Sequence, residues 1–104
     1  MSMKLLMIEE LGDTEKILGI VDKYEIQQLI NAAERHSLKC LSFVDTVGNT
    51  YFNEMQIAEI KNKELAVLEN DPTVNKKLLA MIKEGADIIS QTEHLYLKFE
   101  DFGN

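Results

Sequence analysis

Two spacings of apolar residues along the chain predict both strands and helices. Residues 3–8 are apolar apart from Lys4, as in a strand that is buried on both faces. Residues 95–100 alternate between apolar and polar or amphipathic side chains, which is typical of a strand with one covered face. The pattern over residues 16–21 leaves open whether the chain returns as a strand or as an irregular segment.

A first helix is expected directly after Asp22. This residue suits the N-cap position, and Glu25 follows three residues later, as in a capping box. The apolar positions beyond it recur at helical spacing: Ile26, Leu29, Ile30 and Ala33. Residues 38–44 are then expected to form a strand, residues 45–49 a turn and residues 50–52 a return strand, which together predict a hairpin.

Two further helices are expected in the second half of the chain. Asn53 and Gln56 repeat the capping signal, so a helix is predicted over residues 54–69. Asp71 and Pro72 suit the cap and the first position of the next helix. The buried face of that helix is expected to contain Val74, Leu78, Met81, Ile82, Ile88 and Ile89.

The length of the chain permits one hydrophobic core. At 104 residues, of which 45% are hydrophobic, there is material for a single domain and too little for a second one. The order strand, helix, hairpin, helix, helix, strand predicts an α+β fold over residues 1–104. We expect a mainly antiparallel sheet of three to five strands, with three helices in a single layer on it.

Charge and cysteine content limit which classes of partner the chain can bind and which cellular compartment suits it. Eleven Lys and Arg stand against 18 Asp and Glu, which gives a formal net charge of −7. This balance argues against direct binding of nucleic acid or of an anionic membrane, because both depend on clustered cations. The single cysteine, Cys40, cannot form an intramolecular disulfide, so a cytoplasmic location is expected. No apolar run approaches the roughly 20 residues of a membrane-spanning helix.

Residues with catalytic or metal-binding chemistry are few. A metal site built from His36, Cys40 and His94 is conceivable, but no pair of them has the spacing of known zinc motifs. Structural roles are favoured instead: a helix C-terminus for His36 and a buried apolar position for Cys40. The sequence contains no glycine-rich phosphate loop and no nucleophile elbow. We therefore expect no catalytic residue, no metal and no cofactor, and an enzyme is the minority interpretation.

Two segments of the chain resemble a group of small acidic bacterial proteins. Residues 50–56 read Thr-Tyr-Phe-Asn-Glu-Met-Gln, Glu64-Leu65 and Leu68 follow, and residues 96–101 read Tyr-Leu-Lys-Phe-Glu-Asp. Together they are similar to the pattern T-x-F-N-x-x-Q … E-L-x-x-L … Y-L-x-F-x-G-D, although no glycine directly precedes the final Asp here. That pattern is associated with immunity proteins of polymorphic and contact-dependent growth inhibition toxin systems.

The resemblance implies an inhibitor that binds a cognate toxin in the cytoplasm of the producing cell and occludes it. Nucleases are common among such toxins and are basic where they hold substrate, so a nuclease, with a ribonuclease favoured, would match an acidic inhibitor. A non-enzymatic adaptor or regulatory protein-interaction domain is the alternative. Charge and predicted exposure select the candidate toxin-binding residues Asp13, Glu15, Asp45, Asn49, Tyr51, Glu100 and Asp101. The tyrosines expected at the surface are Tyr24, Tyr51 and Tyr96.

Overall fold

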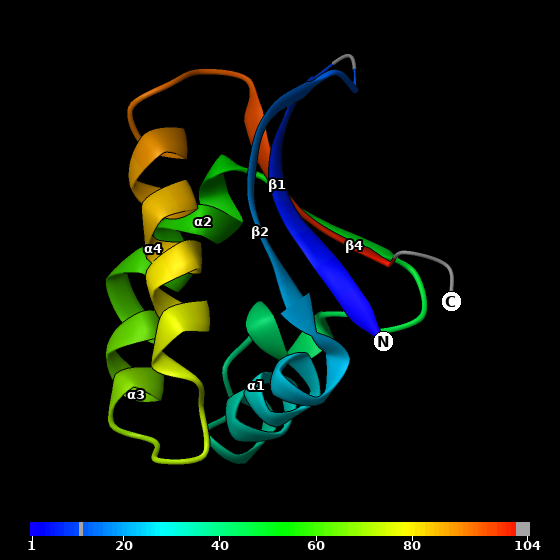
Figure 1. Cartoon of the computed structure of the whole chain (residues 1–104). Helices are drawn as coiled ribbons and strands as arrows, with labels where there is room; N and C mark the ends of the chain where they lie inside the picture. The colour runs from blue at the N-terminus through cyan, green and yellow to red at the C-terminus, as the bar shows by residue number, and fades with distance from the viewer. Residues whose placement is uncertain (11, 102–104) are drawn as a thin grey trace.

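Four antiparallel strands form one sheet, and the helices cover one of its faces (Figure 1). The computed structural model describes residues 1–10 and 12–101. The strands are β1 (Ser2–Glu9), β2 (Thr14–Asp22), β3 (Asn49–Phe52) and β4 (Leu95–Asp101). Their order in the sheet is β2-β1-β4-β3, so the first and last strands of the chain are its two central strands. The expected α+β fold is confirmed.

The two central strands follow the spacing seen in the sequence. On β1, Met3, Leu5 and Met7 enter the main core beneath the helices, while Leu6 and Ile8 are buried on the opposite face. The side chains of β1 are therefore buried on both faces of the sheet, as its unbroken apolar run predicts. On β4, every second residue from 95 to 99 is buried in the core and the residues between them are half-exposed, which confirms one covered face.

The sequence left open whether residues 16–21 form a returning strand. They do, since residues 14–22 form the edge strand β2, which pairs with β1. The register of this pair shifts twice, which leaves Leu18 and Glu15 as extra residues of β2 opposite β1. At the first shift Leu18 packs toward helix α4 (Lys76–Ile89), where a Cβ on Gly85 would lie 2.7 Å from Leu18 Cδ1. The glycine in α4 thus permits close contact between helix and sheet.

The predicted caps of two helices are confirmed. Helix α1 (Lys23–Arg35) begins at Asp22, whose carboxylate accepts a hydrogen bond from the backbone N–H of Tyr24. Helix α2 (Glu54–Glu59) begins with a complete capping box, in which Asn53 and Gln56 exchange side-chain to backbone hydrogen bonds of 3.0 Å. The helix expected over residues 54–69 is continuous but mixed, since α2 passes through a π-helical turn, η2 (Ile60–Glu64), into α3 (Leu65–Glu69).

The hairpin expected over residues 38–52 is wrong. Residues 38–44 form no strand and instead contain a short 3₁₀ turn, η1 (Leu41–Phe43). The buried carboxylate of Glu64 accepts hydrogen bonds of 2.9 Å from the backbone N–H groups of Cys40 and Leu41, which turns the chain at this point. β3 therefore pairs with β4 rather than with a preceding strand.

The start expected for the last helix is also wrong. α4 begins at Lys76, with Asn75 as its N-cap, rather than at Pro72. Asp71 does accept a capping hydrogen bond from the Thr73 backbone N–H at Oδ1, but only an isolated turn follows, and Asn75 then caps α4. Residues 70–75 form a connection between α3 and α4.

Candidate functional site

The face of the sheet opposite to the helices, here called the open sheet face, carries a mixture of apolar and charged side chains. It comprises Lys4, Leu6, Ile8, Ile17, Ile20, Asn49, Tyr51, Tyr96, Lys98 and Glu100. Ile17 and Ile20 are more than half exposed on β2, and Tyr51 is 48% exposed on β3. An apolar sheet face without a covering layer is the kind of surface that proteins use to bind other proteins.

The charges at the centre of the open sheet face are paired with one another within the chain. Glu100 Oε2 lies 2.8 Å from Lys98 Nζ, and Glu100 Oε1 lies 3.7 Å from Lys4 Nζ. The hydrogen bond with Lys98 holds the pKa of Glu100 below its usual range and raises the pKa of Lys98. Lys98 Nζ also lies 5.3 Å from the centre of the Tyr51 ring. Tyr51 is therefore held in place before any partner arrives.

The segment that leads into β3, forms it and follows it carries a concentration of exposed apolar side chains. Phe43, Val47 and Met55 are 76%, 78% and 83% exposed, and Tyr51 belongs to the same stretch. These four are half of the eight large hydrophobic side chains that are exposed in the part of the chain the structure describes. They recur at every fourth residue through η1, the following turn, β3 and the first turn of α2.

Within this segment of the chain, all formal charges have one sign. Between residues 40 and 60 the chain contains no Lys, Arg or His, whereas Asp45 and Glu54 stand on either side of β3. Both acidic residues and Asn49 are exposed. We call the four apolar residues together with these three polar ones the β3 edge surface: Phe43, Asp45, Val47, Asn49, Tyr51, Glu54 and Met55.

Two open hollows adjoin the β3 edge surface. One, of about 310 Å³, is lined by Tyr51, Tyr96 and Lys98 together with Glu9 and Glu10 of the β1 end. The other, of about 320 Å³, is lined by Met55, Glu54, His94 and Tyr96 among others. Each hollow therefore places aromatic or thioether groups beside carboxylates and one basic side chain.

The structure brings four of the seven sequence-predicted residues to the β3 side of the sheet. Asn49 lies directly opposite Glu100 in the register, and Tyr51 is two residues further along the same strand. Asp45 lies close to β3 because its backbone N–H donates a 2.9 Å hydrogen bond to the Thr50 hydroxyl.

The other three predicted residues lie elsewhere. Asp13 and Glu15 are exposed at the turn between β1 and β2 and at the start of β2, the edge strand on the other side of the sheet. Asp101 forms an ion pair of 2.7 Å with Lys23, the first residue of α1, so it contributes to the junction between that helix and the sheet.

Sequence reasoning missed Phe43, Val47, Glu54 and Met55. An apolar residue was expected to face the core, and Phe43 was assigned to a strand that does not form. Their spacing of four residues is no signal by itself, because residues four apart share a face in a helix and this segment contains a turn and a strand. The exposure of these side chains is seen only in the structure.

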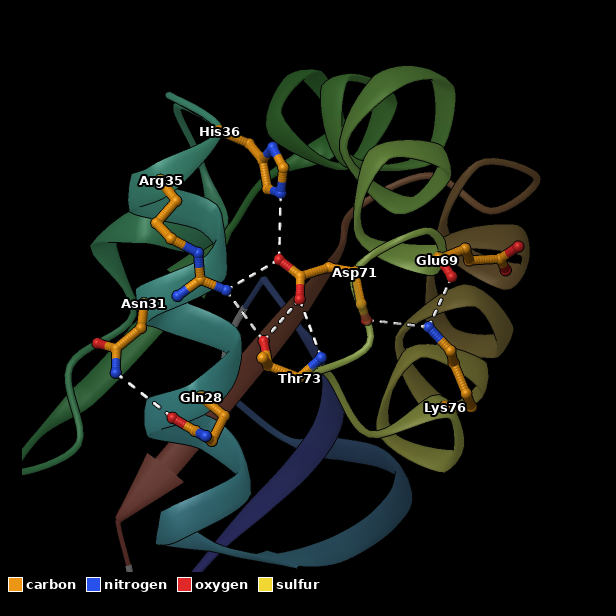
Figure 2. A network of polar contacts seen from close by, with 8 residues as sticks. All are labelled: Gln28, Asn31, Arg35, His36, Glu69, Asp71, Thr73 and Lys76. Carbon is orange, nitrogen blue, oxygen red and sulfur yellow. Dashed lines mark hydrogen bonds and ion pairs between the residues drawn. The ribbon is translucent and has the colours of Figure 1, made fainter.

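A second polar cluster, built around Asp71, lies among the helices (Figure 2). Arg35 and His36, at the end of α1, approach Asp71 Oδ2 to 2.9 and 3.1 Å. Thr73 donates to the other oxygen, Oδ1, from its backbone N–H at 2.9 Å and from its hydroxyl at 2.6 Å. The hydrogen bonds from Thr73, followed by those from Arg35 and His36, hold the pKa of Asp71 far below its usual range. With two partners on each oxygen, this carboxylate is engaged in joining α1 to the α3–α4 connection.

The residues considered as metal ligands have different partners. His36 contacts Asp71, His94 Nδ1 lies 3.2 Å from Glu10 Oε2, and the backbone N–H of Cys40 donates to Glu64. Burial, followed by the nearby Glu64 carboxylate, raises the pKa of the Cys40 thiol to about 11, which leaves it protonated at neutral pH. Within residues 1–10 and 12–101, no three His, Cys, Asp or Glu side chains are grouped so that they could hold a metal ion.

Comparison with protein-family models, with curated proteins and with solved structures finds no match to this chain. Among the helices in the described ranges, none has the length and apolar character required to cross a membrane. The candidate site therefore rests on its own geometry: an unpaired sheet edge, four exposed apolar side chains and carboxylates on either side.

Proposed function

We propose that this chain is a bacterial immunity protein that binds a cognate toxin through the β3 edge surface and blocks it, performing no chemistry itself. The observation that carries the proposal is the concentration of the exposed side chains Phe43, Val47, Tyr51 and Met55 in the segment around β3, whose own charged residues are all acidic. The similarity of residues 50–56 and 96–101 to the immunity-protein pattern supports the same conclusion. The binding would take place in the cytoplasm of the producing cell.

The exposed apolar side chains supply the gain in free energy. Fully burying a Phe, Val or Met side chain stabilises by about 1.5–3 kcal/mol, so three such residues would dominate the contact. Tyr51 adds a large aromatic surface, and its contact with Lys98 reduces the entropy lost when the ring is fixed. An ordinary interface covers about 800 Å² on each partner. The molecule exposes 5772 Å², so the β3 edge surface and its two hollows would be the centre of a patch of ordinary relative size.

The carboxylates determine which partner is accepted. With a net charge of −7 and no cation between residues 40 and 60, this surface attracts a basic protein and repels an acidic one. The active site of a nuclease, and a ribonuclease in particular, has the complementary charge, because it must hold a phosphate backbone. Occupation of that site would exclude the nucleic acid substrate, and inhibition would need no catalytic residue.

The test uses the toxin domain encoded by the gene immediately upstream. Binding of the purified chain to that domain would be measured by calorimetry, and protection by co-expression of the two in cells. The triple variant Phe43→Ser/Val47→Ser/Met55→Ser is expected to bind about 100-fold more weakly or worse. The matched control, Ile17→Ser/Ile20→Ser on the β2 edge, removes comparably exposed apolar groups and should change the affinity by no more than about threefold.

Two outcomes would contradict the proposal, one its function and the other its binding surface. If the wild-type chain neither binds nor protects against the upstream product, the chain is not an immunity protein for it. If the control on β2 abolishes binding while the β3 variant does not, the function stands but the binding surface is misassigned.

A further inference from the structure

The two edges of the sheet differ in how they are protected against pairing with another strand. β2 contains two irregularities in its register with β1 and carries Lys16 on its exposed length. Bulges and lysines are devices by which proteins prevent an edge strand from recruiting a further strand. β3 has neither, because its four residues pair with β4 without a register shift and include no charged side chain.

The outer side of β3 is available for hydrogen bonding. Among the described residues, β4 is the only strand that pairs with residues 49–52, and no backbone hydrogen bond links them to a loop. An edge strand presents alternate N–H and C=O groups outward, which form a template for an added strand. We propose that the toxin adds an extended segment to this edge, as a fifth strand beside β3. The inference rests on the proposed function and specifies how the partner is held.

The edge is shaped before binding. The Phe52 and Phe99 rings meet edge to face at 5.9 Å and 88°, which fixes the end of β3 against β4. The capping box formed by Asn53 and Gln56 then starts α2 directly after the strand. A strand that is already ordered loses little conformational entropy when a second strand pairs with it.

The charges indicate what the added segment contains. Asp45 and Glu54 lie before and after β3, so a segment with Lys or Arg toward its two ends would be matched. Between them, an apolar or aromatic side chain would pack against Tyr51 on the open sheet face, as cross-strand neighbours do. A second copy of this chain fits less well, because it would bring the same two carboxylates to the edge and no cation from residues 40–60.

Amide hydrogen exchange of the complex tests the inference directly. The free chain and its complex with the upstream toxin domain would be compared by NMR, residue by residue. Strand addition predicts that outward-pointing amides among residues 49–52 exchange at least about tenfold more slowly in the complex. The amides of β2 serve as the internal control and should keep their free-state rates.

The outcomes separate the two proposals. No complex at all would overturn the proposed function and this inference with it. A complex in which the β3 amides exchange as in the free chain would overturn the added strand and leave the immunity function standing. A complex in which the β2 amides are protected and the β3 amides are not would show that the strand adds to the β2 edge, and would overturn the inference as well.

A charge variant provides a second readout. Asp45→Asn/Glu54→Gln is expected to weaken binding of the toxin domain about tenfold and to reduce its dependence on salt. The matched control is Glu34→Gln/Glu69→Gln, which removes two exposed carboxylates from α1 and α3. Equal effects of the two double variants would mean that only net charge matters, and would contradict cations placed at the ends of the added segment.

Discussion

The Asp71 cluster and the β3 edge surface are the two regions of this molecule that attract attention as sites, and they differ in where their partners are. At Asp71, each carboxylate oxygen has two hydrogen-bond or ion-pair partners supplied by the chain itself. At the β3 edge, Phe43, Val47 and Met55 extend into solvent, and the strand between them pairs on one side only.

The difference separates residues that hold the fold from residues that are available to a partner. A strongly lowered pKa is a common sign of a functional site, yet at Asp71 it reports a carboxylate whose hydrogen bonds stabilise the fold. To find a binding surface in this molecule, it is therefore more useful to ask which groups lack partners within the chain than to ask which group has the largest pKa shift.

The largest effect is expected from removing the carboxylate that shapes the approach to β3. Glu64→Ala would leave the buried N–H groups of Cys40 and Leu41 without an acceptor. Each such loss costs about 1–3 kcal/mol, so unfolding in urea should show a decrease of about 3 kcal/mol or more in stability. Glu64→Gln keeps one acceptor oxygen and should lose less. Unchanged stability in Glu64→Ala would mean that η1 is held by other contacts.

A smaller loss is expected at Asp71. Asp71→Asn keeps the size of the side chain but removes the charge that Arg35 and His36 face and one of the acceptors for their hydrogen bonds. The melting temperature should fall by several degrees in a thermal scan, while binding of the toxin domain is retained. The control Glu69→Gln, at an exposed carboxylate two residues away, should leave the melting temperature unchanged. Lost binding with an unchanged melting temperature would reverse the assignment of the two regions.

The pH dependence of stability should report the same carboxylate. The folded-state pKa of Asp71 is below its unfolded value of about 4, so the unfolded chain binds more protons at this site in acid. Its contribution is fully present above about pH 5 and is progressively lost as the pH falls from there toward the folded-state pKa. Urea unfolding of wild type and Asp71→Asn should therefore differ most at neutral pH and converge in acid. A constant difference between pH 7 and pH 3 would contradict this linkage.

The parts of the fold that were predicted from sequence depend on neighbours in the chain. The alternation in β4 and the capping box of Asn53 and Gln56 involve residues within a few positions of each other, and both are confirmed. The strand expected over residues 38–44 failed because the deciding acceptor, Glu64, is more than 20 residues further along. The helix expected to start at Pro72 does not form although its capping hydrogen bond, from Thr73 to Asp71, is present, because the chain makes only a single turn before Asn75 starts α4.

The residues of the candidate site likewise fall into those that could be predicted from the sequence and those that could not. Asp45, Asn49 and Tyr51 were selected because polar and aromatic residues near a turn are commonly exposed, and they do lie together. Phe43, Val47 and Met55 were missed because an apolar residue is first expected in the core. They lie in η1, in a turn and at the start of α2, and their exposure depends on how these segments pack against distant parts of the chain.

The smallest expected effect is on the stability of the β3 edge variant, and it completes the comparison. Phe43→Ser/Val47→Ser/Met55→Ser removes side chains that contribute little to the core, so each change should alter stability by no more than about 0.5 kcal/mol. Urea unfolding at neutral pH would measure this, with Ile17→Ser/Ile20→Ser as the matched control at the other edge. A loss approaching that of Glu64→Ala would place these three residues in the fold. A stable variant that no longer binds the toxin domain would show that the residues used for binding are different from those that stabilise the fold.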